Sequence, residues 1–220
     1  MTETATVPTA PPAGAARVEV RIEDDASPIV RLIGRTLRDS VLAGHAFETL
    51  RRSTGTVAIR SHDTPQAAVI AFGANGIDVS SGVVVEPDVT LTVDLNARFA
   101  AVGDPVGDFD LAAGILAALS PPLPDWRAAA RSFWEVARSM PGIPDVLIAV
   151  TEGPDGVEQA VVGQGSSRYL IAGAPDTLAG IFSGADDLLA VLSSGVLGIQ
   201  GTLSQLSVMV GASWKVRYDD

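Results

Sequence analysis

The residue types that most often carry catalysis are scarce in this 220-residue chain. It has no cysteine, two histidines (His45 and His62) and one lysine, Lys215. A hydrolase needs a histidine next to a nucleophile and an orienting carboxylate. His45 falls in a helical pattern, His62 falls at the end of an expected strand, and no G-x-S-x-G motif occurs. The sequence therefore predicts no catalytic residues and no enzyme. An enzyme would need a polar cluster around His45 or His62 inside a pocket.

Metal-binding and phosphate-binding motifs are also missing from the sequence. Asp186 and Asp187 are adjacent, but they stand at the start of an expected helix, where carboxylates cap free N–H groups. The segment GQGSSR, residues 163–168, lacks the G-x-G-x-x-G spacing and the lysine of a phosphate-binding loop, which indicates a turn between strands. We therefore predict no metal site and no cofactor.

The composition favours a protein that neither binds nucleic acid nor spans a membrane. The formal net charge is −11, whereas nucleic acids and anionic lipid surfaces attract positive charge. Only 5% of the residues are aromatic, so the expected core consists of Ala, Val, Leu and Ile. No apolar run approaches the roughly 18 residues of a membrane-spanning helix, and the N-terminus lacks the pattern of a signal peptide. These features predict a cytoplasmic protein.

Hydrophobic periodicity predicts mixed α and β structure in the first half of the chain. Apolar residues at every fourth position within 27–53 are typical of a helix, which Gly34 and Gly44 weaken or divide. Apolar and polar residues alternate from Val89 to Asn96, as in a strand with one buried face. The other elements predicted up to residue 120 are strands at 54–62 and 66–73 and helices at 97–103 and 108–120.

The second half follows the segment PPLPD, residues 121–125. Its prolines cannot continue a helix, so we predict a linker there. Asp125 is the expected N-cap of the next helix. The elements predicted after the linker are that helix, strands at 145–150, 157–163, 167–173 and 177–182, a helix at 186–194, a strand at 196–201 and a last helix from Leu203.

The two halves of the sequence are alike at collinear positions. Matches that keep the same order at similar offsets indicate a repeated structural unit. In this chain Pro87-Asp88 matches Pro175-Asp176, and Gly103 matches Gly195.

The predicted organisation has three parts. Residues 18–120 form a first repeat and residues 121–220 form a second. Residues 1–17 have few large apolar side chains, so they cannot bury enough surface to offset the entropy of ordering. We expect them to be a disordered tail, and they are a candidate docking segment for a protein partner.

Apolar side chains concentrate between Asp186 and Trp214. Leucine, methionine and small residues mixed with glycine can line a pliable apolar cavity, and the same composition also builds an ordinary core. The residues predicted to line a ligand-binding cavity are Leu188, Leu189, Leu192, Val196, Leu197, Ile199, Leu203, Leu206 and Met209.

Residues 175–211 resemble the C-terminal signature of sterol carrier protein 2-like (SCP2-like) domains. The shared features are a strand led by Pro-Asp, an Asp-Leu-Leu helix that ends in glycine, the strand GVLGIQG at 195–201 and a following apolar helix. The resemblance covers most of 125–220 and, more loosely, about 30–103. It implies an α+β fold: a mainly antiparallel sheet, helices packed on one face and an apolar tunnel between them. Two repeats would form a pseudo-dimer in which the first copy is degenerate.

The resemblance also implies a function, because members of the family bind fatty acyl chains, sterols or other lipids without catalysing a reaction. We therefore expect non-catalytic binding or carriage of a hydrophobic ligand of fatty acyl, sterol or isoprenoid type in an apolar cavity. The alternative is a structural or protein-interaction module without a ligand. Such a module would recruit its partner through the tail or the acidic surface.

Overall fold

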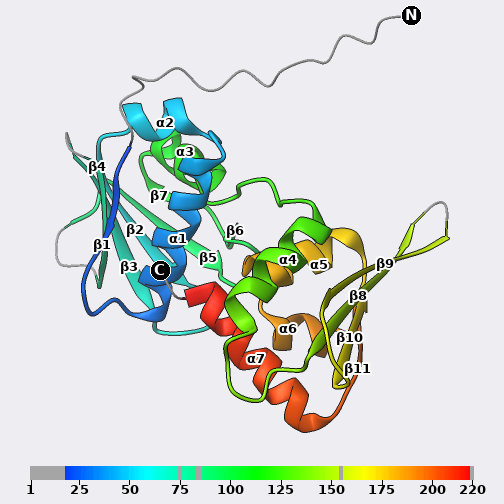
Figure 1. Ribbon diagram of the computed structural model, residues 1–220. Helices are drawn as coiled ribbons and strands as arrows, with labels where there is room; N and C mark the ends of the chain where they lie inside the picture. Colours follow the sequence, from blue (N-terminus) through cyan, green and yellow to red (C-terminus); the bar gives the residue numbers. More distant parts are fainter. Residues whose placement is uncertain (1–17, 74–75, 83–85, 154–155, 219–220) are drawn as a thin grey trace, which may run out of the picture.

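Two β-sheets form outer layers of the molecule, and helices of both halves lie between them (Figure 1). The computed structural model describes residues 18–73, 76–82, 86–153 and 156–218. The tail predicted at residues 1–17 lies outside the described residues, so its disorder and its docking role stay predictions. We use "first half" for residues 18–120 and "second half" for residues 121–218.

The first half contains the larger sheet and three helices. The helical region predicted at 27–53 is divided into two helices by a turn at Gly44, as the sequence suggested, whereas Gly34 remains inside the first helix. The elements are β1 (Val20–Ile22), α1 (Pro28–Leu42), α2 (Phe47–Arg52), β2 (Gly55–Ser61), β3 (Ala67–Gly73), β4 (Gly76–Ser81), β5 (Val89–Asp94), β6 (Ala100–Ala101), β7 (Val106–Gly107) and α3 (Phe109–Ala118).

The second half contains the smaller sheet and four helices. Asp125 caps its first helix as predicted, because the carboxylate accepts the N–H groups of Arg127 and Ala128. The elements are α4 (Trp126–Ala137), β8 (Val146–Gly153), β9 (Gly156–Gly163), β10 (Arg168–Gly173), α5 (Pro175–Ser183), α6 (Leu188–Ser193), β11 (Leu197–Gln200) and α7 (Leu203–Tyr218).

Both sheets are built around a hairpin flanked by a parallel strand. In the first sheet, with order β1-β4-β3-β2-β5-β6, strand β2 pairs antiparallel with β3 and parallel with β5, and β7 also pairs with β5. In the second, with order β11-β10-β8-β9, strand β8 pairs antiparallel with β9 and parallel with β10. The predicted α+β class with mainly antiparallel pairs is confirmed. The shared strand order accords with the predicted duplication, but the duplication and the pseudo-dimer stay predictions.

The strand predicted at 177–182 is wrong, because this segment lies in helix α5. Pro175 occupies the first turn, where its fixed φ favours a helix and its missing N–H costs nothing. An apolar run of six residues does not distinguish a strand from a buried helix by periodicity. Pro87-Asp88 precedes a strand and Pro175-Asp176 opens a helix, so this match does not support the repeat.

The helix predicted at 97–103 is also wrong. The Asp94 carboxylate accepts the N–H groups of Asn96 and Ala97, which closes the chain into a turn. Arg98 and Phe99 follow with φ values of +52° and +61°, and the chain then enters β6. This tight turn brings Arg98 to Asp186 of the second half.

The buried side chains form two clusters, one in each half. The first lies within residues 20–119 and is aliphatic apart from Phe99, as the composition predicts. The second lies within residues 126–212 and contains five aromatic side chains, so a purely aliphatic core is wrong for this half. Phe133 on α4 and Phe182 on α5 form its centre, with ring centroids 5.4 Å apart. The proline segment 121–125 lies between the clusters in sequence.

Candidate functional site

A cleft of about 1280 Å³ lies between the two halves. The first half contributes one side of α1 and the turn at 97–100, and the second contributes α4 and the ends of α5 and α7. The prolines of the segment 121–125 form part of its wall, so the predicted linker also shapes the site. Apolar walls with a few polar groups, at an interface between substructures, are typical of small-molecule sites.

Helix α4 presents one face to this cleft and another to the core. Ala128, Ser132 and Val136 are spaced four residues apart, so they lie along one stripe of the helix and line the cleft. Phe133 is buried and reaches the cleft from the core side of the helix. Val136 is 41% exposed, which leaves apolar surface open to a ligand.

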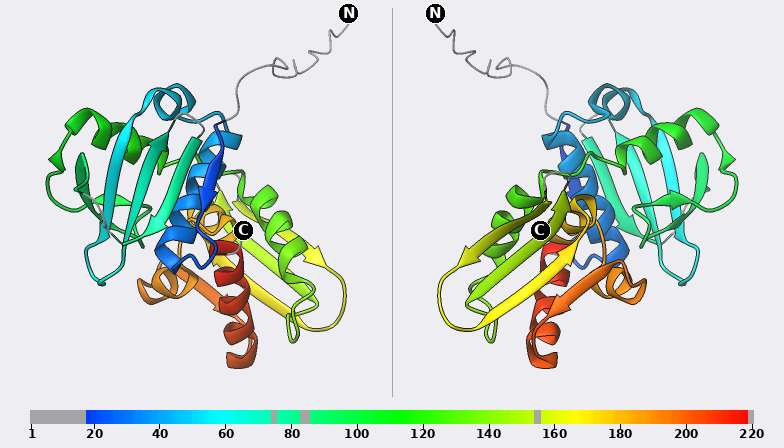
Figure 2. Two further views of the ribbon diagram at one scale, coloured as in Figure 1. Left: turned by 90° about the vertical axis from the view of Figure 1, so that its left-hand side faces the viewer. Right: turned by 90° about the vertical axis from the view of Figure 1, so that its right-hand side faces the viewer.

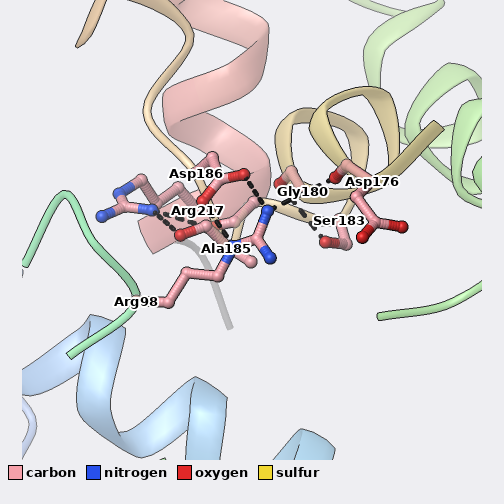
Figure 3. Close-up of polar contacts among 8 residues, drawn as sticks. Arg98, Asp176, Gly180, Ser183, Ala185, Asp186 and Arg217 are labelled. Carbon is pink, nitrogen blue, oxygen red and sulfur yellow. Dashed lines mark hydrogen bonds and ion pairs between the residues drawn. The ribbon is translucent and has the colours of Figure 1, made fainter. Parts of the chain in front are cut away.

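An ion pair joins the halves beside the cleft (Figure 3). Arg98 donates from Nε to Asp186 Oδ1 over 2.7 Å and from Nη2 to Asp186 Oδ2 over 2.5 Å. The Asp186 hydrogen bond raises the pKa of Arg98 despite its partial burial. Gly180 permits this approach, because a Cβ there would overlap Asp186 Oδ2. The predicted helix-capping role is wrong for Asp186 and correct for Asp187, which accepts the N–H of Ala190.

Arg217 is a second link between the halves, and it is only 1% exposed (Figure 3). Its Nη1 donates to the carbonyl oxygens of Gly184 (2.9 Å) and Ala185 (2.7 Å) in the second half. Its Nη2 donates to the carbonyl oxygen of Leu95 in the first half over 2.7 Å. Gly184 has a φ of +76°, and a Cβ there would lie 3.0 Å from the Arg217 backbone, so the position requires glycine.

Arg35 brings a third guanidinium to the cleft wall. Its Nη2 donates to the carbonyl oxygen of Ser183 and lies 3.9 Å from Asp39 Oδ2. Burial lowers the pKa of Arg35, and the nearby Asp39 charge opposes that shift. Burial also raises the pKa of Asp39, which Arg35 opposes. Arg35 therefore links α1 of the first half to the end of α5 in the second.

The residues predicted to bind a ligand do not line the cleft between the halves. Leu188, Leu197 and Met209 are buried in the second core, and Leu192, Ile199 and Leu206 pack against it. The remaining three face solvent to differing extents: Leu189, Val196 and Leu203. Their role in ligand binding stays a prediction.

The two histidines lie away from the cleft lining. His45 Nε2 is 2.9 Å from the carbonyl oxygen of Ala117, and His62 Nδ1 is 3.9 Å from Asp63 Oδ1. Among the described residues, no group of three His, Cys, Asp or Glu side chains is arranged to hold a metal ion. No helix in the described ranges has the length and hydropathy needed to span a bilayer.

Tyr169 offers a test of the second core. Its Oη is buried and has no hydrogen-bond partner among the described residues, and burial raises its pKa from 10.0 to about 12. The Tyr169 hydroxyl therefore ionises near pH 10 in the unfolded chain and near pH 12 in the folded one. The free energy of unfolding falls by roughly 2–3 kcal/mol as the pH rises from below 10 to above 12. About 1.3 kcal/mol of this loss falls between pH 9 and pH 11, and we expect Tyr169→Phe to remove it, measured by urea denaturation at the two pH values. Equal losses in both proteins would contradict it.

Several solved structures are similar to this chain in part. The solution structure of palmitated SCP2L2 from Aedes aegypti is 12% identical and covers 39% of this chain and 87% of its own, with a TM-score of 0.30. The crystal structure of the same Aedes protein is 14% identical and covers 38% of this chain and 88% of its own, with a TM-score of 0.31. Apo sterol carrier protein 2 from Yarrowia lipolytica is 10% identical and covers 90% of this chain and 98% of its own, with a TM-score of 0.20.

All three are sterol carrier protein 2 domains. They belong to the family that the sequence resembles, but at these TM-scores they carry no argument about ligand or mechanism. No protein-family model matches the chain, and no curated protein matches it.

Proposed function

We propose that this chain binds a hydrophobic small molecule, of fatty acyl, sterol or isoprenoid type, in the cleft between its halves and does not transform it. The volume of about 1280 Å³ carries this proposal, because ordinary ligand pockets measure roughly 300–1,000 Å³ and the cleft therefore has room for a ligand of this size. A ligand that buries about 300 Å² of apolar surface there gains roughly 7 kcal/mol before the costs of ordering. A cytoplasmic location is part of this proposal.

The cleft suits an amphipathic ligand better than a purely apolar one. Phe99, Phe133 and Val136 supply apolar wall. The lining also contains charged side chains of both signs: Arg35, Asp39, Arg98, Asp176 and Lys215. A polar end group would therefore meet a polar part of the wall and need not lie against apolar surface alone. The apolar residues of the second core, from Leu188 to Met209, are the other proposed location.

Filling the cleft tests the proposal. We expect Ser132→Trp to weaken binding of a fluorescent fatty acid at least tenfold, because Ser132 lines the cleft at the exposed face of α4. Ser139→Trp is the matched control, since Ser139 is exposed just beyond α4 and outside the lining. Native mass spectrometry of the purified proteins gives a second readout of co-purified lipid.

Each outcome of this experiment is informative. Loss of binding in Ser132→Trp alone supports the cleft. Equal binding by both variants excludes the cleft and leaves the second core as the location. Absence of any bound fatty acid or sterol in the unmodified protein overturns ligand carriage, and favours the structural or protein-interaction alternative.

A further inference from the structure

The outer face of the second sheet exposes aliphatic side chains. Figure 2 (right) shows its strands on the viewer's side, with the helices behind them. Val157 and Val161 on β9 are 71% and 54% exposed. Ile148 on β8 and Leu170 on β10 are half-buried and do not belong to the second core. Contiguous apolar surface of this kind marks an interaction site.

The first sheet provides an internal comparison for this surface. Its strands share the hairpin-plus-parallel-strand arrangement, and its outer face is mostly polar. Val69, Val102 and Val106 are the larger aliphatic residues on that side, and they lie apart from one another among short or polar neighbours. The polar residues there are Arg60, Asp78, Ser80, Thr90 and Thr92. The fold therefore tolerates a solvated outer face, and the aliphatic face of the second sheet is a specific property.

The strand register arranges this face in rows that cross the strands. One central row contains Gln159, Val150, Ala172 and Gly198. The next contains Val161, Ile148, Leu170 and Gln200. Glu152 lies beyond the first row and Arg168 lies beyond the second, so opposite charges flank the apolar centre. Neither Glu152 nor Arg168 has an ion-pair partner within the described part of the chain.

We propose that two copies of this chain associate through these faces, with their strands antiparallel about a two-fold axis. The axis runs across the strands, so the first row of one copy lies over the second row of the other. Ala172 then faces Leu170 of the partner subunit, and Gly198 faces Gln200 of the partner subunit. A small side chain meets a larger one at these two positions, as interdigitating sheets require. Val150 meets Ile148 of the partner subunit on the neighbouring strand, so aliphatic side chains pack at the centre of the face.

The charges select this arrangement. The antiparallel axis brings Glu152 to the end of the face that carries Arg168 of the partner subunit. An axis along the strands would instead keep like charges at the same end, without pairing them. Complementary charges at the rim of an apolar patch fix the orientation of a complex more than its affinity.

The size of the face predicts a weak dimer. Four strands about 4.8 Å apart and four rows about 7 Å apart give roughly 540 Å² per copy. This area is below the approximately 800 Å² per partner of a standard stable interface. We therefore expect dissociation in the micromolar range, so the protein is a dimer at high concentration and a monomer when dilute.

Sedimentation equilibrium of the full chain over a hundredfold range of concentration tests the proposal. We expect Val161→Glu to raise the dissociation constant at least tenfold, because it places a charge beside Ile148 in the second row, where association would bury it. Val106→Glu is the matched control, since Val106 is 72% exposed on the first sheet, and its dissociation constant should equal that of the unmodified protein. Both positions are exposed, so both variants should fold.

A charge exchange tests the orientation. Glu152→Arg and Arg168→Glu should each weaken the dimer severalfold, and the double variant should restore the constant to within twofold. A monomer at every concentration overturns the proposal, as does an equal effect of Val106→Glu. A monomer that binds neutral lipid vesicles through Val161 also overturns it, because the occupant would then be a membrane. Failure of the double variant to restore association overturns the antiparallel arrangement.

Discussion

Replacing Arg217 with methionine is expected to lower the free energy of unfolding by about 3 kcal/mol. The substitution keeps the aliphatic stem but removes the donors that serve the carbonyl oxygens of Leu95, Gly184 and Ala185. Arg217 is 1% exposed, so water cannot replace those donors without a rearrangement. Arg217→Lys should recover only part of the loss, because a single ammonium cannot reproduce the planar fork that reaches both halves.

Urea denaturation monitored by circular dichroism measures this effect. Arg131→Met is the matched control, because Arg131 is an exposed arginine of α4, and we expect it to change stability by less than about 0.5 kcal/mol. A loss below about 1 kcal/mol for Arg217→Met would show that the carbonyl groups find other partners. Two separate unfolding transitions in the variant would show that Arg217 also couples the halves.

Phe133→Ala is expected to cost about 4 kcal/mol of stability, the largest effect of any substitution at the cleft. Phe133 is buried and packs against Phe182 with ring centroids 5.4 Å apart. The variant therefore loses buried apolar surface and also an aromatic pair, which contributes about 1 kcal/mol. Because Phe133 forms part of the cleft wall, the cavity that it leaves joins the cleft.

The control for this prediction is Val136→Ala on the same helix. Val136 is 41% exposed, so we expect a loss of less than about 1 kcal/mol, measured by urea denaturation. Phe133→Leu keeps most of the apolar volume and should remain folded, which allows ligand binding to be measured. A fatty acid affinity that does not change in Phe133→Leu would contradict the role of Phe133 as a wall of the ligand site.

The sequence predicts helices and strands correctly where one local pattern is clear. The alternation in β5 buries Val89, Leu91 and Val93, and the carboxylate of Asp125 starts α4, as expected. The prediction from sequence failed at α5, because a short apolar run has no period that distinguishes a helix from a strand. It also failed after Asp94, where side-chain hydrogen bonds to the backbone favour a turn over a helix.

The cleft could not be predicted in the same way. Many of its residues are alanines, serines and prolines, and the lining becomes a site only when distant segments meet. Arg98 and Asp186 are 88 positions apart, and no sequence pattern indicates which arginine reaches which aspartate. The concentration of apolar residues between Asp186 and Trp214 belongs largely to the second core, because cores and cavities have the same composition.

The contact between Leu95 and Arg217 has a consequence for biosynthesis. The two residues are 122 positions apart, so at roughly 5–20 residues per second the ribosome adds Arg217 about 6–24 s after Leu95. Throughout that interval the carbonyl oxygen of Leu95 still awaits its donor. The nascent first half therefore exposes its cleft-facing surface to chaperones before α7 arrives to close the junction.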